Sequence, residues 1–186
     1  GALVEAARLE GAGLAPADDL GRLAVLGLVR HAEEALRGDP AYRHELAHWT
    51  HDLSERRDGV PVEAFAPWTA VESVPLRNFG QAPRPAPVAC GPRLTIAALY
   101  TFGDTRAQWL TAGRALQRVL LTATLHGIAS TLMTQPMEIP RLRQLLAAPV
   151  DERVTAQAVL RFGYADASPA TPRRRLDEVV EVVATA

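Results

Sequence analysis

The chain has 186 residues, of which 48% are hydrophobic and 22% charged, and this balance is typical of a folded domain rather than a disordered segment. A formal net charge of -1 gives no general attraction to nucleic acid or to an anionic membrane, and no apolar run approaches the roughly 20 residues that cross a bilayer. We therefore expect a soluble, cytoplasmic protein with a single domain over residues 1–186, no nucleic-acid or membrane partner and, with Cys90 as its one cysteine, no internal disulfide.

Helical spacing of apolar residues dominates the start of the chain and predicts helices over residues 2–12 and 17–37. The glycines and the proline between these two ranges indicate a break rather than a further element. In the second helix we expect a buried apolar stripe of four residues, Leu20, Leu23, Leu26 and Val29.

A third helix is predicted by capping chemistry. Asp39 followed by Pro40 matches a helix N-cap with proline in the first helical position, and the helix should run to about Leu53. The turn sequence of residues 58–61 follows it. Residues 62–92 lack any sustained period and end in a proline-rich stretch, so we expect an irregular flap or linker there.

Strands and helices alternate in the second half of the chain. Strands are predicted over residues 93–100, 128–133 and 154–164 from their short apolar runs. A long helix over residues 104–126 lies between the first two strands, and a short helix from Pro140 to about Ala147 lies between the last two. This alternation after an all-helical opening predicts an α+β fold.

The long helix over residues 104–126 has both of its ends marked in the sequence. Asp104 is the expected N-cap, and Gly127 is expected to close the helix in the left-handed conformation. Its buried face should contain Trp109, Gly113, Leu116, Leu120 and Thr124. The three tryptophans are expected in the core: Trp49, Trp68 and Trp109.

A metal-binding pattern occurs within the third predicted helix. His44-Glu45-Leu46-Ala47-His48 fits the H-E-x-x-H pattern of zinc peptidases, in which both imidazoles share one helix face and the glutamate activates a metal-bound water. No spacing in the sequence identifies a third ligand. A half-exposed helix with polar residues explains the segment more simply, so we assign no metal ligand.

A candidate ligand-binding turn follows the strand predicted at residues 128–133. Its proline fixes an extended turn, and the amides that follow have no sheet partners and can point at a ligand. A plain connection between a strand and a helix is the other interpretation. The turn consists of Gln135, Pro136, Met137 and Glu138.

A cluster of arginines near the C-terminus is the second candidate. Two adjacent guanidinium groups can bind one phosphate through paired hydrogen bonds, which arginine does better than lysine. A solvated basic tail is an equally good interpretation of the pattern by itself. The cluster follows Pro172 and consists of Arg173, Arg174 and Arg175.

Several segments, taken in order, make the chain similar to a known family. They are residues 42–50, 57–61, 109–121, 135–138, 159–164 and 172–175. Their order from about Leu3 onward resembles the C-terminal half of the Acg-type nitroreductase-like proteins of actinobacteria, which consist of two nitroreductase-like halves. The N-terminal Arg-x-Ser-x-Arg motif and the Asn-x-Gln-Pro-Trp strip of these enzymes do not occur in the sequence, so it resembles one half.

The resemblance implies an antiparallel sheet wrapped by helices, with flavin mononucleotide (FMN) at the seam between two such halves. Pro136, Met137 and Glu138 would border the flavin ring, with the Glu138 amide near the ring nitrogen that accepts hydride. Arg173 and Arg175 would hold the flavin phosphate, and Arg174 could replace either. The other side of the site would come from a homodimer partner or from a missing N-terminal half.

The function expected from this resemblance is an FMN-dependent oxidoreductase. It would take hydride from NADH or NADPH and reduce a flat nitro-aromatic or quinone-like acceptor. Because the flavin performs the chemistry, no acid–base residue is assigned. The alternatives are a flavin-binding or storage protein without turnover, a structural half that completes a partner's site, and a zinc hydrolase that uses His44, Glu45 and His48.

Overall fold

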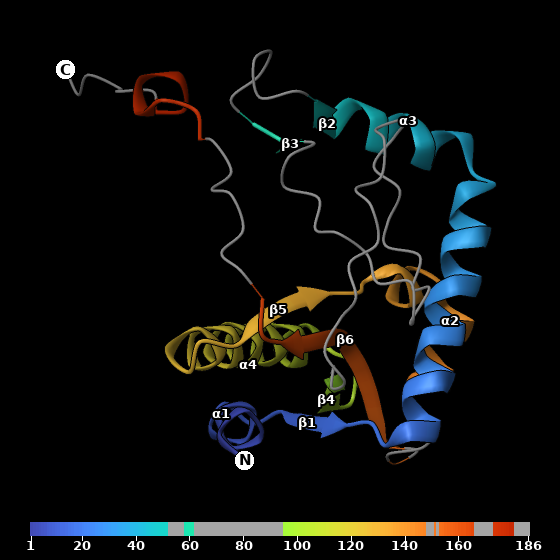
Figure 1. The fold of residues 1–186 in the computed structure, drawn as a ribbon, viewed down its shortest axis with the longest axis vertical. Coiled ribbons are helices and arrows are strands. Elements are labelled where there is room, and N and C mark those ends of the chain that lie inside the picture. The colour runs from blue at the N-terminus through green and yellow to red at the C-terminus, as the bar shows by residue number, and fades with distance from the viewer. Residues whose placement is uncertain (52–57, 62–94, 148–150, 152, 166–172, 181–186) are drawn as a thin grey trace.

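The computed structural model describes residues 1–51, 58–61, 95–147, 151, 153–165 and 173–180. Within these ranges the chain folds around a four-stranded antiparallel sheet in the order β1-β4-β6-β5, with helices on both faces (Figure 1). The expected α+β architecture is therefore confirmed. The flap expected at residues 62–92 lies outside the described ranges. None of the described helices is both long and apolar enough to cross a membrane.

The main sheet consists of β1 (Gly13–Pro16), β4 (Thr95–Phe102), β5 (Ala129–Leu132) and β6 (Val154–Gly163). The last three match the predicted strands. The expectation that the chain only breaks between residues 11 and 16 is wrong, because β1 forms there. Its register places Gly13 opposite Tyr100 and Pro16 opposite Ala97 on β4. Proline is tolerated because β1 is an edge strand.

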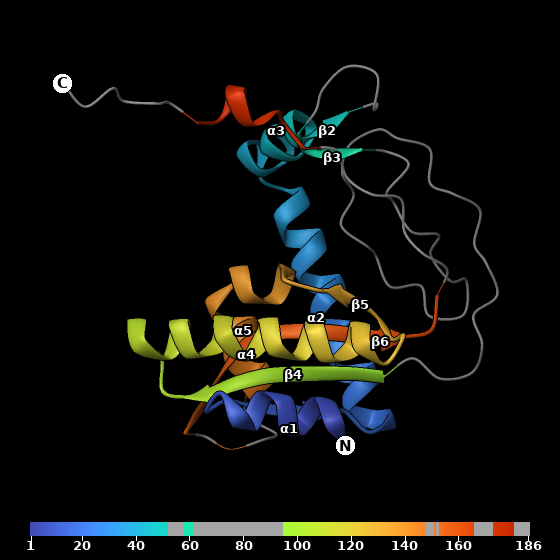
Figure 2. The same ribbon diagram turned by 90° about the vertical axis from the view of Figure 1, so that its left-hand side faces the viewer.

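Helices cover the sheet from both sides, as Figures 1 and 2 show. On one face α1 (Ala2–Leu9) packs beside α4 (Arg106–Leu125), and both contribute to a core cluster that includes Leu99, Val119 and Leu160. On the other face α2 (Asp19–Arg37) and α5 (Pro140–Ala147) enclose a second cluster around Val29 and Val159. The sheet is thus the middle layer of three.

The apolar faces of the long helices differ in part from those expected. On α2, Leu26 and Val29 are buried, whereas Leu20 and Leu23 are exposed. On α4, the residues that face the sheet are small: Ala112, Ala115, Val119 and Ala123. Small side chains let α4 approach both the sheet and α1 closely. The expected buried face of α4 is therefore displaced, with Leu116 and Leu120 only at its edge.

The segment directly after α2, with α3 (Pro40–Trp49), β2 (Thr50–His51) and β3 (Val60–Pro61), extends away from the main sheet (Figures 1 and 2). Asp39 caps α3 as expected, because its Oδ1 accepts a hydrogen bond of 2.8 Å from the amide of Ala41. The helix ends at Trp49 rather than near Leu53. The reason is that Thr50 adopts an extended conformation, so that β2 pairs in parallel with β3.

Candidate functional site

The candidate ligand-binding turn forms a short 3₁₀-helix, η2 (Gln135–Glu138), between β5 and α5. Gln135 and Pro136 are buried, Met137 is partly buried against the core cluster below α2, and Glu138 is exposed. The amide of Met137 donates to the carbonyl of Thr134 at 2.8 Å, so this amide is already used within the turn. The turn is therefore anchored at its start and exposed only at its end, at Glu138.

Behind the turn lies a charged residue that the sequence patterns did not single out. Gln135 Nε2 lies 3.5 Å from Glu33 Oε2 on α2, and Arg37 Nε donates to Glu33 Oε1 at 3.1 Å. The Glu33 side chain is only 1% exposed. A signal for it does exist in the sequence, because Glu33 falls at helical spacing from Leu26 and Val29 and so interrupts a buried stripe with a charge.

The three candidate arginines are exposed and lie directly before the short 3₁₀-helix η3 (Leu176–Glu178). Arg174 Nε is 3.5 Å from Asp58 Oδ2, and Arg175 Nε donates to Asp177 Oδ1 at 3.0 Å. Arg174 and Arg175 remain more than half exposed in these ion pairs. Their guanidinium groups are thus accessible to an anion from solvent.

The two candidate segments come from different regions of the described structure. In Figures 1 and 2, η3 (red) lies at the same end of the molecule as α3, β2 and β3, away from the main sheet, whereas η2 lies against α2 and α5. Residues 166–172, which connect β6 to the arginines, are outside the described ranges. The joint role of the turn and the arginines in one flavin site stays a prediction.

The H-E-x-x-H segment lies on α3, where His44, Glu45 and His48 are all exposed. Among the described residues, no group of three or more His, Cys, Asp or Glu side chains is placed to hold a metal ion. This region therefore gives the zinc hypothesis no support. Two of the tryptophans expected in the core, Trp49 and Trp109, are exposed instead.

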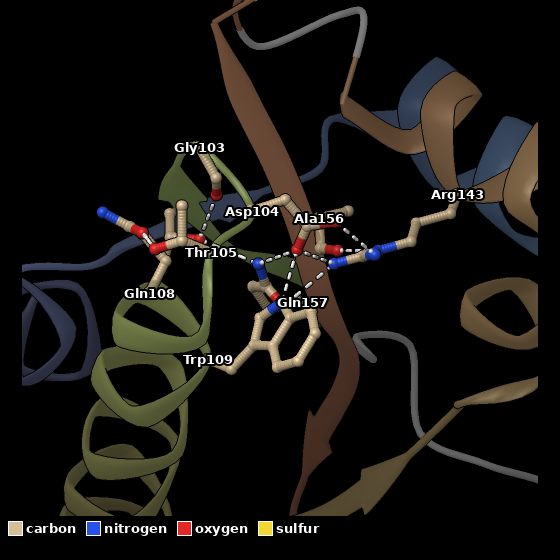
Figure 3. Close-up of polar contacts among 9 residues, drawn as sticks. Gly103, Asp104, Thr105, Gln108, Trp109, Arg143, Ala156 and Gln157 are labelled. Carbon is tan, nitrogen blue, oxygen red and sulfur yellow. Dashed lines mark hydrogen bonds and ion pairs between the residues drawn. The ribbon is translucent and has the colours of Figure 1, made fainter.

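A polar cluster near the start of α4 replaces the expected N-cap (Figure 3). Asp104 does not cap the helix, whose N-cap is Thr105, and the Thr105 side chain makes no capping hydrogen bond to the backbone. Instead Arg143 donates to both carboxylate oxygens of Asp104 at 2.8 Å, Trp109 Nε1 donates at 2.6 Å, and Gln157 Nε2 donates at 3.2 Å. The Arg143 guanidinium holds the pKa of Asp104 below its ordinary value of 3.8.

A bulge in β6 supplies the rest of this cluster. Between Leu99 and Tyr100 the register of β4 with β6 skips one residue, so Gln157 is the extra residue of the bulged strand. Arg143 Nε donates to the carbonyl of Ala156 at 2.7 Å, and its Nη2 donates to Gln157 Oε1 at 3.0 Å (Figure 3). Arg143 thus makes hydrogen bonds to three residues, which is the behaviour of a structural clamp.

Two hollows lie beside these features. One, of about 450 Å³, has Asp104, Arg143 and Met137 in its wall, so the polar cluster and η2 border the same space. The other, of about 780 Å³, follows the outer face of α4 along Trp109 and Leu121. None of the candidate site residues lines this second hollow, and we do not associate it with the flavin chemistry.

Comparison with known proteins agrees with this architecture. The sequence pattern of the nitroreductase family matches residues 30–164. The chain is 35% identical over 157 residues to the candidate NAD(P)H nitroreductase acg of Mycobacterium tuberculosis. This alignment covers 77% of this chain and 45% of the relative. A second candidate NAD(P)H nitroreductase of that organism, Rv3131, is 38% identical over 134 residues, or 60% of this chain and 39% of the relative. The match therefore spans less than half the length of each relative.

A solved structure shares the fold. The nitroreductase NfnB from Sphingopyxis sp. strain HMH superposes with a TM-score of 0.52 at 17% identity, covering 98% of this chain and 89% of that one. At this identity the likeness concerns the arrangement of helices and strands alone. The family match is more specific, because it runs from the middle of α2 to the end of β6 and so includes η2 and the polar cluster. The chain belongs to the nitroreductase family.

Proposed function

We propose that this chain provides one side of an FMN site in an oxidoreductase that takes hydride from NADH or NADPH and reduces a nitro-aromatic or quinone-like acceptor. The observation that carries the proposal is the form of η2. Gln135 and Pro136 are fixed in the core, Met137 is half-buried and borders the hollow beside Asp104, and Glu138 is exposed. This arrangement suits the presentation of a rigid edge to a flat ring.

The residues of the chain would bind and orient the cofactor. When bound, FMN would supply the hydride acceptance and electron transfer. In the proposed site the Glu138 amide would lie near the ring edge, where a fixed donor would stabilise negative charge more effectively than water does. The partly apolar surface of Met137 suits contact with the ring face.

The phosphate would be held by the arginine cluster. The exposed guanidinium groups of Arg173, Arg174 and Arg175 provide paired N–H donors and positive charge. The existing ion pairs of Arg174 and Arg175 are exposed to solvent, so exchanging a carboxylate for a phosphate there costs little free energy.

The relatives support this assignment. Acg and Rv3131 are described as candidate NAD(P)H nitroreductases, and NfnB is described as dependent on FMN and NADPH. Since the chain matches less than half of acg and Rv3131, we propose that a homodimer partner or a further half-domain supplies the other side of the site.

Titration of the purified chain with FMN, followed by flavin fluorescence, tests the proposal. We expect saturable binding, and anaerobic NADH or NADPH should then bleach the flavin absorbance. Binding without bleaching would indicate flavin storage instead of turnover. A chain that leaves added FMN unbound contradicts the proposal.

The phosphate assignment has a separate test. The double variant Arg173→Ala/Arg175→Ala should weaken FMN binding by about tenfold or more, the effect of losing charge-assisted hydrogen bonds. Its affinity for riboflavin, which lacks the phosphate, should not change. Arg153→Ala is the matched control, because Arg153 is also exposed and paired with an aspartate. Equal losses for FMN and riboflavin would contradict a phosphate role.

A further inference from the structure

A buried carboxylate lies directly behind η2, and the proposed chemistry does not use it. Glu33 is on α2 with its side chain 1% exposed. It follows Leu26 and Val29 on the helix face that packs into the core. A carboxylate removed from water is strongly disfavoured unless partners compensate its charge. A residue of this kind therefore needs a reason other than burial of apolar area.

The two oxygens of Glu33 point to different parts of the fold. Oε1 accepts from Arg37 Nε at 3.1 Å, one helical turn later and close to solvent. Oε2 lies 3.5 Å from Nε2 of Gln135, whose side chain is also buried. This second contact is long for an N–H···O hydrogen bond. In a buried site, however, little water competes for either group.

Gln135 connects Glu33 to the candidate site, because it contacts Glu33 and is the first residue of η2. The next residue, Pro136, is almost completely buried and has a fixed φ angle. The Met137 amide closes the turn on Thr134 at 2.8 Å. Because the turn is short and internally bonded, a displacement of Gln135 displaces Met137 and Glu138 with it.

We infer that Glu33 is a positioning residue for the flavin-facing turn: through Gln135 it sets where Met137 and Glu138 stand relative to the sheet. The effect on flavin rests on the proposed function, whereas the effect on the turn does not. A purely stabilising role is the competing explanation. Apolar replacement of a buried polar group is often neutral for stability, so stability alone does not separate the two.

Hydrogen–deuterium exchange of the whole chain without flavin tests the structural part. Glu33→Gln keeps the size of the side chain and removes its charge, and we expect several-fold faster exchange in the peptide of residues 133–139. Glu34→Gln is the matched control, because it makes the same change at the neighbouring exposed position of α2. Exchange that is the same in both variants would overturn the inference.

A double-variant cycle shows whether the effect passes through Gln135. Gln135→Met removes the contact from the other side and should reproduce the faster exchange of residues 133–139. In the Gln135→Met background, Glu33→Gln should add nothing further. Additive effects would overturn the inference, since Glu33 would then act on the turn by another route. Gln135→Met also keeps the test open if Glu33→Gln folds poorly.

The flavin consequence is measured with FMN and riboflavin. Glu33→Gln should weaken both by about tenfold and shift the midpoint potential of the bound flavin, because the ring contact changes and the phosphate contact does not. Glu34→Gln should match wild type. Unchanged affinity and potential in Glu33→Gln would overturn the inference. If wild type binds no FMN while exchange at residues 133–139 responds as expected, the proposed function fails and the positioning of the turn is supported.

Discussion

The Asp104 cluster and the Glu33–Gln135 contact are both built around a carboxylate. They differ in the burial of that carboxylate and in the number and length of its hydrogen bonds. Asp104 is 38% exposed and accepts hydrogen bonds of 2.6–3.2 Å from Arg143, Trp109 and Gln157. Glu33 is buried and its contact with Gln135 is long. Several hydrogen bonds near solvent stabilise the fold, whereas a buried contact between residues of two different elements is better suited to setting the position of a turn.

The largest effect on stability is expected when the side chain of Arg143 is removed. Arg143→Ala removes the hydrogen bonds to Asp104, Ala156 and Gln157, and we expect the free energy of unfolding to fall by about 2–3 kcal/mol after allowance for partial exposure. Chemical denaturation measures this loss. Arg141→Ala, at an exposed position on the same helix, is the control and should change little. Equal losses in both variants would show that Arg143 is not a clamp.

A smaller effect on stability is expected at the buried pair. The double variant Glu33→Leu/Gln135→Leu replaces both polar groups by apolar ones and should change the free energy of unfolding by less than about 1 kcal/mol, in either direction. The same variant should lose most of its FMN affinity if the turn is mispositioned. Denaturation and flavin titration of one preparation measure both quantities. A loss of stability as large as that of Arg143→Ala would remove the distinction between the two regions.

Local chemistry in the sequence predicts much of the fold, and pairing between distant segments accounts for what it misses. Asp39 and Pro40 locate the start of α3, because a cap acts within a few residues. The strand β1 could not be predicted from Gly13 and Pro16, since it exists through its register with β4, more than 80 residues later. The buried face of α4 was misplaced because hydrophobicity favours leucine, whereas close packing here requires alanine.

In the candidate site too, features set by local sequence were predictable, and contacts between distant segments were not. Gln135 and Pro136 stand out by sequence because a turn follows a predicted strand, and the structure shows how they are anchored. The bond between Asp104 and Arg143 was not predictable, because capping is the usual role of an aspartate before a helix and the arginine lies 39 residues later. Glu33 interrupts a predicted buried stripe and could have been noticed in the sequence, but its contact with the turn depends on the packing of η2 on α2.

The pH dependence of stability offers a finer test of the clamp. Since Arg143 lowers the folded-state pKa of Asp104 below 3.8, the folded state favours the ionised carboxylate. Its contribution is complete above about pH 4 and disappears as the pH falls through the lowered folded value. We expect the difference in unfolding free energy between wild type and Asp104→Asn to shrink on acidification through this window. A difference that stays constant from pH 7 down to pH 2 would show that the charge of Asp104 is not involved.

The smallest effect on stability is expected for Asp151, although its pKa is clearly lowered. Exposure to solvent and the number of partners matter more for stability than the pKa shift itself. Arg153 lowers the pKa of Asp151 to about 2. The Arg153 side chain is 80% exposed, however, so water and salt screen the attraction. Asp151→Asn should leave the melting temperature at pH 7 within the scatter of repeated scans, at low and at high salt. A loss comparable to that of Asp104→Asn would mean that ion-pair geometry alone determines stability, and the contrast between the two carboxylate regions would then need another explanation.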